Sequence, residues 1–226
     1  MIQTNIMDVL EALEKDKKIY DIFKNCPYEI LRTIQLKRYK AGKFVLEQGV
    51  VHDTFYILVE GCADIYVESE HGKKYYLNTY EKGQYIGELE IFDRVPYMSR
   101  IEAKGEVVVL EVSRENCLKW IRSDQNFSEY ILHTLCRGTY RTYQNMGDNS
   151  LYTLKQRICQ FLIDNTDDEG HFHVPLHAET LSERMAVTPR SVNRILKQLK
   201  DDDVIEIKKT MVTIKNYDQL LEEREK

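Results

Sequence analysis

Apolar residues in the first part of the chain recur every three or four positions, which is the spacing of an amphipathic helix. Two such runs are present: Val9, Leu10 and Leu13, then Ile19, Ile22 and Phe23. Pro27 begins a further short helix that extends through Ile34. The sequence up to about residue 35 is therefore predicted to be helical.

From Tyr39 onward the pattern changes to short runs of β-branched and aromatic residues. The strand candidates are residues 43–46, 55–59, 63–67, 74–77 and 107–112. Glycines separate these runs, and His71-Gly72 suits a hairpin turn because glycine adopts positive φ angles without strain. Short strands with turn signals about every ten residues predict an antiparallel β-roll or jelly-roll barrel.

A helical pattern returns after Ser113, which is a candidate cap for a short helix. A longer helix is predicted at residues 125–146, followed by a hinge at residues 147–150. The apolar stripe of the long helix either packs on the barrel or forms a seam between two subunits, and its alternating polar and aromatic positions favour the seam. The chain thus divides into residues 1–124, a helix with its hinge at 125–150, and residues 151–226.

The strongest functional signal lies in residues 177–199. Thr188 can cap a helix, and Pro189 suits the first turn because proline has no N–H to lose. This helix has a buried stripe and an open face. The stripe is Val192, Ile195, Leu196 and Leu199, and the open face is Arg190, Ser191, Asn193, Arg194 and Lys197.

A shorter helix precedes this one and is expected to pack through Leu181 and Met185. Two helices joined by a turn of three or four residues form a helix-turn-helix. Residues 204–207 and 212–214 are predicted to form a β-hairpin wing, with its turn at Lys208-Lys209-Thr210.

The net charge of the 226 residues is −5, which argues against a protein that coats nucleic acid with its whole surface. Residues 184–200 are an exception, because they contain five basic residues and no acidic one. No apolar run is long enough for a membrane span, and the N-terminus has no secretory signal pattern. A cytoplasmic protein without a membrane partner is therefore expected.

Candidate metal and redox chemistry is sparse. The five cysteines are odd in number and widely spaced, without a C-x2-C pair, so no disulfide, zinc site or iron–sulfur cluster is expected. His171, His173 and His177 have a spacing seen in metal sites, but no cysteine or dedicated carboxylate accompanies them. No metal, cofactor or catalytic residue is predicted.

Glycine and charged motifs follow one another in a definite order along the chain. They are Gly42-x6-Gly49, Gly61, Gly72 and residues 83–89 (GQYIGEL), then Thr188-x2-Ser191-Val192-x-Arg194-Ile195-Leu196. In this order they resemble the Crp/Fnr family of bacterial transcription regulators over nearly the whole chain. The resemblance implies an α+β protein with an N-terminal cyclic-nucleotide-binding-like β-roll, a long dimerisation helix and a C-terminal winged helix-turn-helix.

The same resemblance implies a homodimer that binds a palindromic operator on double-stranded DNA, with RNA polymerase as a further partner. The barrel or its ligand would change how the dimer helices pack, and thereby the spacing of the two recognition helices. The helix from Pro189 would enter the major groove. The predicted DNA-binding residues are Thr188, Arg190, Ser191, Asn193, Arg194, Lys197, Lys208 and Lys209.

Within this set the two arginines can pair with guanine, Ser191 and Asn193 can reach a base edge or phosphate, and the lysines can contact phosphates. The sequence also departs from the family pattern. Pro189-Arg190 replaces an Arg-Glu start, which predicts a different DNA site. Ala186 stands where the turn usually has a glycine, a mild change.

The effector pocket departs from the family more strongly. Gly87 and Glu88 match the first phosphate-binding pair, but the Arg-Ser pair expected next falls on Tyr97-Met98 or on Met98-Ser99. Arg100 is the nearest arginine, but it falls at neither place of the expected pair, and successive residues of a strand face opposite sides. Losing the guanidinium costs a bound cyclic phosphate about 1.5–3 kcal/mol. An effector other than cyclic AMP is therefore predicted, or none, in which case Gly87 and Glu88 serve as turn and strand residues.

Three alternatives remain. One is a regulator that does respond to cyclic AMP, and another is a nucleotide-binding signalling module whose winged helix docks protein. The third is a cupin-like enzyme, which would need several metal-binding histidines. Residues 39–112 contain only His52 and His71, so an enzyme is not expected.

Overall fold

The computed structural model describes residues 6–167, 177–209 and 211–225. The chain forms two compact units, one of Met1–Lys73 with Leu77–Gly138 and one of Lys74–Tyr76 with Thr139–Lys226. His171 and His173, two members of the metal-like histidine spacing, lie outside the described residues. Within the described part, no group of three or more His, Cys, Asp or Glu side chains could hold a metal ion, and no helix could cross a bilayer.

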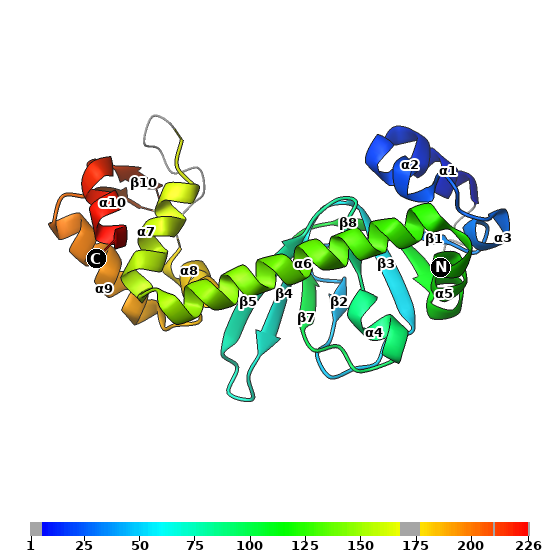
Figure 1. The fold of residues 1–226 in the computed structure, drawn as a ribbon, viewed down its shortest axis with the longest axis horizontal. Helices are drawn as coiled ribbons and strands as arrows, with labels where there is room; N and C mark the ends of the chain where they lie inside the picture. Colours follow the sequence, from blue (N-terminus) through cyan, green and yellow to red (C-terminus); the bar gives the residue numbers. More distant parts are fainter. Residues whose placement is uncertain (1–5, 168–176, 210, 226) are drawn as a thin grey trace. The chain divides into compact units, whose positions relative to one another are not determined.

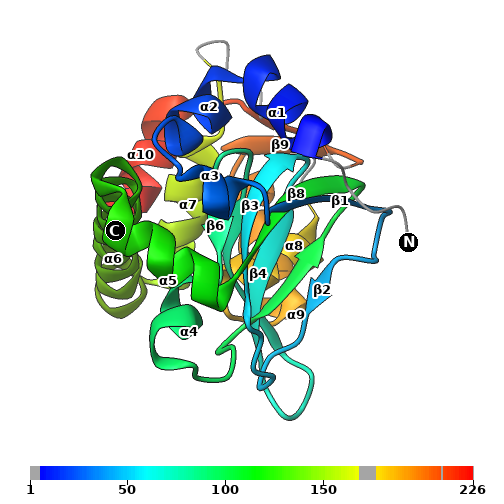
Figure 2. The same ribbon diagram turned by 90° about the vertical axis from the view of Figure 1, so that its right-hand side faces the viewer.

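The chain begins with three helices, α1 (Ile6–Lys15), α2 (Lys17–Phe23) and α3 (Tyr28–Leu31). Asp16 caps α2, because its carboxylate accepts hydrogen bonds from the backbone N–H groups of Lys18 and Ile19 at 2.8 and 3.1 Å. The predicted apolar positions of α1 and α2 are buried in the core of the first unit, except Leu10, which is only partly buried. In Figures 1 and 2 the three helices gather at the same end of this unit as α5 (Arg114–Ser123).

Two four-stranded sheets form the β-roll of the first unit. One has the order β1 (Gln35–Tyr39), β8 (Val107–Ser113), β3 (Thr54–Glu60), β6 (Tyr85–Ile86), and the other β2 (Val45–Leu46), β7 (Arg100–Ala103), β4 (Ala63–Glu68), β5 (Lys74–Tyr80). The register is antiparallel between β3 and β8 and between β4 and β7. The expected antiparallel β-roll is confirmed.

The structure also holds elements that the sequence pattern did not reveal. These are strands β1, β6 and β7, helix α4 (Glu88–Asp93) and the last helix, α10 (Tyr217–Glu225). Glu88 is thus the first residue of a helix, so its assignment to a strand was wrong. Gly87 precedes it with φ 102°, a left-handed conformation that glycine adopts without strain.

The aromatic residues at the start of α6 (Gln125–Leu151) anchor this helix in the first unit. Phe127 stacks on Trp120 with ring centroids 3.6 Å apart, and Ser113 caps α5 as predicted. Helix α6 continues through residues 147–150, so the expected hinge is wrong. A single glycine costs a helix only about 1 kcal/mol, and the Ser150 hydroxyl bonds to the Met146 carbonyl instead of ending the helix.

The second unit contains the helix-turn-helix. Its elements are α7 (Leu154–Asp164), α8 (Ala178–Met185), α9 (Pro189–Asp201), the wing strands β9 (Ile205–Lys208) and β10 (Met211–Ile214), and α10 (Tyr217–Glu225). Leu181 and the four predicted residues of the α9 stripe are buried in one core, against which Met185 packs. The winged helix-turn-helix expected from the sequence is confirmed.

Candidate DNA-binding face and effector site

Helix α9 begins with a complete N-terminal cap. Thr188 accepts a hydrogen bond from the backbone N–H of Ser191 at 3.2 Å, and the two hydroxyl oxygens lie 3.0 Å apart. Pro189 occupies the first turn, where its missing N–H costs nothing. Thr188 and Ser191 thus stabilise the start of the helix, and Ser191 is only partly exposed.

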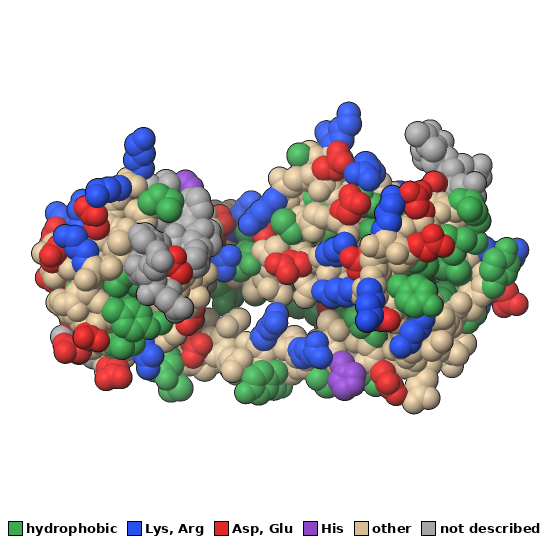
Figure 3. All heavy atoms as spheres, turned by 90° about the horizontal axis from the view of Figure 1, so that it is seen from above, with side chains coloured by type: hydrophobic (Ala, Val, Ile, Leu, Met, Phe, Trp, Pro, Cys, Tyr) green, Lys and Arg blue, Asp and Glu red, His purple; other side chains and the backbone are tan. Residues whose placement is uncertain are grey.

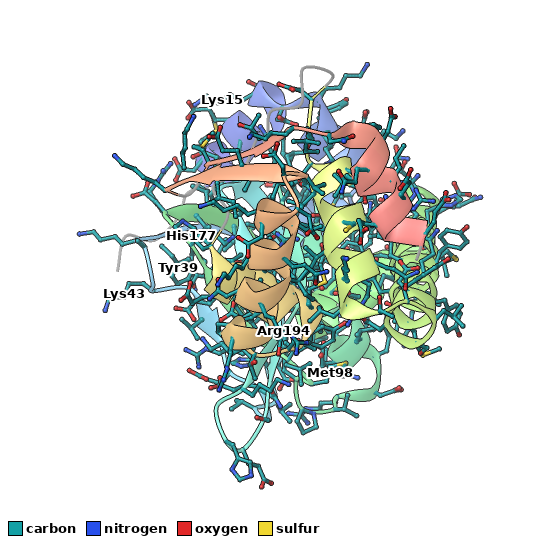
Figure 4. All side chains as sticks on the ribbon, turned by 90° about the vertical axis from the view of Figure 1, so that its left-hand side faces the viewer. Lys15, Tyr39, Lys43, Met98, His177 and Arg194 are labelled. Atoms are coloured by element: carbon teal, nitrogen blue, oxygen red, sulfur yellow. The ribbon has the colours of Figure 1, made fainter. Side chains whose placement is uncertain are left out.

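The outward side of α9 carries Arg190, Asn193, Arg194, Lys197 and Lys200, all exposed. Four of the five are cations, and among the described residues none of these cations forms an ion pair with a carboxylate. Figure 4 labels Arg194 on α9 in the view that looks onto this helix. The helix therefore presents uncompensated positive charge, although acidic and basic groups are interspersed over the face that Figure 3 draws.

A shallow groove of about 330 Å³ connects α9 with the wing. Its lining residues are Ala178, Asn193, Leu196, Lys197, Lys200, Ile207 and Lys209. Lys209 of the wing and two lysines of α9 thus border one continuous surface. Lys200 belongs to this surface although the sequence interpretation left it out of the binding residues.

The two wing lysines differ in their surroundings. The Lys208 ammonium lies 3.0 Å from a Glu206 carboxylate oxygen, which partly neutralises it. Lys209 has φ 58°, which is left-handed. Glycine usually occupies such a position in a turn, but this turn has none. Thr210, the third residue of the predicted turn, lies outside the described residues.

The turn between α8 and α9 is strained at Ala186. Its φ of 55° is left-handed, and for a residue with a Cβ this conformation costs about 1–2 kcal/mol. The change from glycine is therefore less mild than the sequence suggested. Arg157 of α7 supports the turn, because its guanidinium donates to the Met185 carbonyl at 3.4 Å and also to Asn149. Arg157 was not predicted, because nothing in the local sequence pattern marks it as a functional residue.

The predicted effector residues divide between the interior and the surface of the β-roll. Tyr97 and Ser99 are buried, and Gly87 lies beside the Tyr97 hydroxyl, so close that a Cβ on Gly87 would be 2.6 Å from it. Met98 is exposed, and it is labelled in Figure 4. The β-roll therefore holds Gly87, Tyr97 and Ser99 in its interior, whereas Met98 lies on the surface and not with them.

Arg100 faces away from this interior. In β7 the buried side chains are Ile101 and Ala103, so Arg100 and Glu102 point to the opposite side of the strand. The Arg100 guanidinium pairs with Glu47 and with Glu102. It does not replace the phosphate-binding arginine, as the alternation along the strand led us to expect.

Comparison with known proteins places the two units in one family. The family model of the cyclic nucleotide-binding domain matches residues 36–124, and the model of the Crp-like helix-turn-helix domain matches residues 156–223. The chain belongs to the Crp/Fnr family. It is a DNA-binding transcription regulator of the Crp/Fnr type.

Relatives in this family align over most of the chain. The cAMP-activated global transcriptional regulator CRP of Salmonella typhimurium is 24% identical over 178 residues, which is 75% of this chain and 84% of the relative. Regulatory protein YeiL of Escherichia coli O157:H7 is 22% identical over 199 residues, 88% of this chain and 90% of the relative. Both are named as regulators, not as enzymes.

The fold of this Crp/Fnr protein is also found in solved structures. The c-di-GMP responsive global regulator CLP of Xanthomonas campestris matches with a TM-score of 0.72 at 15% identity, over 88% of this chain and 98% of that chain. This likeness concerns the fold.

Proposed function

We propose that this regulator binds a palindromic operator as a homodimer, and that a small effector other than cyclic AMP controls its affinity for DNA. The observation that carries the proposal is the open face of α9, which presents Asn193 and a row of cations that form no ion pair within the described part of the chain. An α-helix fits the major groove, where side chains can distinguish all four base pairs. We expect a cytoplasmic location, because the proposed operators lie on DNA in the cytoplasm.

The residues of α9 and the wing fall into two groups, those suited to contact bases and those suited to contact phosphates. Arg190 and Arg194 lie four positions apart, so their guanidinium groups share one side of the helix and can each fork onto guanine O6 and N7. Asn193 is the residue suited to adenine. Lys197 and Lys209 border the groove beside the wing and serve as phosphate contacts.

Helix α6 supplies the proposed dimer seam. Five exposed residues on it follow the alternating four- and three-residue spacing of a coiled coil: Leu132, Cys136, Thr139, Tyr143 and Met146. Phe127 and Ile131, by contrast, are buried in the first unit. Helix α6 thus has one side packed in the core and a second side that is exposed. The exposed side fits a contact with a second copy of this chain.

In the proposed mechanism, effector binding in the β-roll changes the packing of the two α6 helices, which resets the distance between the two α9 helices. Recognition requires that distance to match half-sites about 34 Å apart. RNA polymerase is the proposed downstream partner at the promoter. The missing guanidinium at Met98 and the outward position of Arg100 support an effector other than cyclic AMP.

Selection of DNA sequences from a random library by the full-length protein tests this function. We expect a two-fold symmetric motif with half-site centres about one helical turn apart, bound by two chains per duplex. Sedimentation of the complex measures the number of chains. An asymmetric motif bound by one chain would contradict the homodimer, and enrichment of no motif would contradict operator recognition.

A further inference from the structure

Four side chains in the first unit form a group of hydroxyls and carboxyls, which we call the tyrosine–glutamate cluster: Tyr80 and Glu88, which are partly buried, and Glu90 and Tyr97, which are buried. The Tyr80 hydroxyl lies 3.5 Å from a Glu88 carboxylate oxygen. The Tyr97 hydroxyl lies beside Gly87, the residue before Glu88. The cluster therefore occupies the region where the family resemblance places an effector.

The cluster contains two carboxyl groups and no basic group. Burial raises the pKa of Glu88 to about 7, and the neighbouring Glu90 raises it further, although hydrogen bonds oppose the shift. Burial likewise raises the pKa of Glu90. The carboxylates also raise the pKa values of Tyr80 and Tyr97, whose main cause is burial. All four groups thus lack the cation that would hold them in their charged forms.

The nearby arginines are bound elsewhere. Arg94 pairs with Asp53 through two hydrogen bonds of 2.8 and 3.1 Å. Arg114 donates to the carbonyls of Ile91 and Phe92 at the end of α4. Arg100 is held on the outer side of β7 by Glu47 and Glu102. Each guanidinium is therefore already engaged away from the cluster.

One polar group of the cluster is unsatisfied within the described residues. Tyr97 is 2% exposed, and its hydroxyl has no hydrogen-bond partner. Nε2 of His52 also lacks a partner, and the His52 and Tyr97 rings meet edge to face with centroids 5.1 Å apart. Burying a polar group without a partner destabilises the fold, so this hydroxyl points to a ligand that would complete its bonding.

We propose that the tyrosine–glutamate cluster binds a small organic cation with an ammonium group, positioned between the carboxylates and the tyrosine rings. Aromatic faces attract ammonium groups, and carboxylates add the opposite charge. An anionic phosphate would instead meet two carboxyl groups and no guanidinium. The inference rests on the proposed function, because it assigns the chemical class of the effector at the same site.

Calorimetric titration of the full-length protein at pH 8 tests the proposal with two cations, choline and putrescine. The neutral carbon isostere of choline, 3,3-dimethylbutan-1-ol, is the matched control ligand, and cyclic AMP is the anionic one. We expect at least one cation to bind and the two control ligands not to bind. Failure of both cations to bind, or equal binding of the neutral alcohol, would overturn the proposal.

Two conservative variants locate the binding. Glu88→Gln removes one charge, and Tyr97→Phe removes the unpartnered hydroxyl; we expect each to weaken binding of the cation about tenfold or more. Glu102→Gln is the matched control, because its carboxylate lies on the outer side of β7, and it should leave binding unchanged. Equal effects of Glu88→Gln and Glu102→Gln would place the cation elsewhere and overturn the assignment.

Operator binding measured beside the titration separates this inference from the proposed function. A cation that binds the cluster without changing affinity for the operator would contradict effector control while leaving the site intact. A protein that binds its operator but takes up neither cation would contradict the site while leaving DNA recognition intact.

Discussion

The open face of α9 and the tyrosine–glutamate cluster differ in the surroundings of their charged groups: those of α9 are exposed to water, and those of the cluster are desolvated. On α9, Arg190, Arg194 and Lys197 are exposed and have no acidic partner among the described residues, so their charge is available to a polyanion. In the cluster, Glu88 and Glu90 are desolvated and have no basic partner among residues 6–167, 177–209 and 211–225. An exposed unpaired charge costs little because water solvates it, whereas a buried one shifts its pKa and destabilises the fold.

The two kinds of site are therefore recognised by different features. An exposed binding face repeats with the helix period and is visible in the order of residues. A buried site depends on which distant segments meet, and it is marked by unsatisfied groups.

The substitution Glu88→Gln should stabilise the ligand-free protein in a pH-dependent way. The pKa of Glu88 is about 7 in the folded protein, above the ordinary 4.5, so the wild type loses stability as pH rises from 4.5 through 7. Glutamine does not titrate. The gain in free energy of unfolding should grow to the order of 3 kcal/mol at pH 8 and be small near pH 4.5. Denaturant unfolding at both pH values measures it, and a pH-independent difference would contradict uncompensated burial of this carboxyl.

Replacing two equally buried tyrosines with phenylalanine should give different results. The Tyr85 hydroxyl donates to the Ile131 carbonyl at 2.8 Å, whereas the Tyr97 hydroxyl has no partner in the part of the chain that the structure describes. Tyr85→Phe should therefore lower the free energy of unfolding by about 1–2 kcal/mol, and Tyr97→Phe should leave it unchanged or raise it. Losses of the same size in both variants would show that Tyr97 is satisfied in the ligand-free protein.

The substitution Ala186→Gly should stabilise the helix-turn-helix. Glycine relieves the left-handed strain at φ 55°, although it also adds entropy to the unfolded chain, so the net gain in free energy of unfolding is expected near 0.5–1 kcal/mol. The thermal unfolding transition of the second unit measures this gain in the free energy of unfolding. Ala178→Gly is a suitable control, because Ala178 is the first residue of α8 and does not have a positive φ, so glycine there relieves no strain and should not stabilise. A loss of stability in Ala186→Gly would contradict the strained turn.

The sequence predicted the regions where periodicity is strong. The α9 stripe at Val192 and Leu196 and the cap at Thr188 are local features, and the structure contains both as expected. Strand β7 was missed because only Ile101 and Ala103 alternate within four residues, too short a pattern to stand out. The supposed hinge at Gly147 failed because one glycine does not end a helix that continues on both sides.

The effector region was predictable only in part. Neighbouring residues of a strand face opposite sides, so Arg100 and Ser99 were expected on different faces without any tertiary information. The proximity of the Tyr97 hydroxyl to Gly87 depends on how the loop after α4 returns to the roll, where Tyr97 exchanges backbone hydrogen bonds with Gly49 and Val50. Such contacts between distant segments leave no trace in the order of residues.

The most direct test of DNA recognition compares Arg194→Ala with Lys197→Ala on the selected operator and on unrelated DNA, over a range of salt concentrations. Arg194→Ala should cost about 1–3 kcal/mol on the operator and much less on unrelated DNA, because it reads a base. Lys197→Ala should weaken both equally and reduce the salt slope by about one, because it contacts a phosphate. If Arg194→Ala weakened binding to both DNAs to the same extent, α9 would not be the element that reads the sequence.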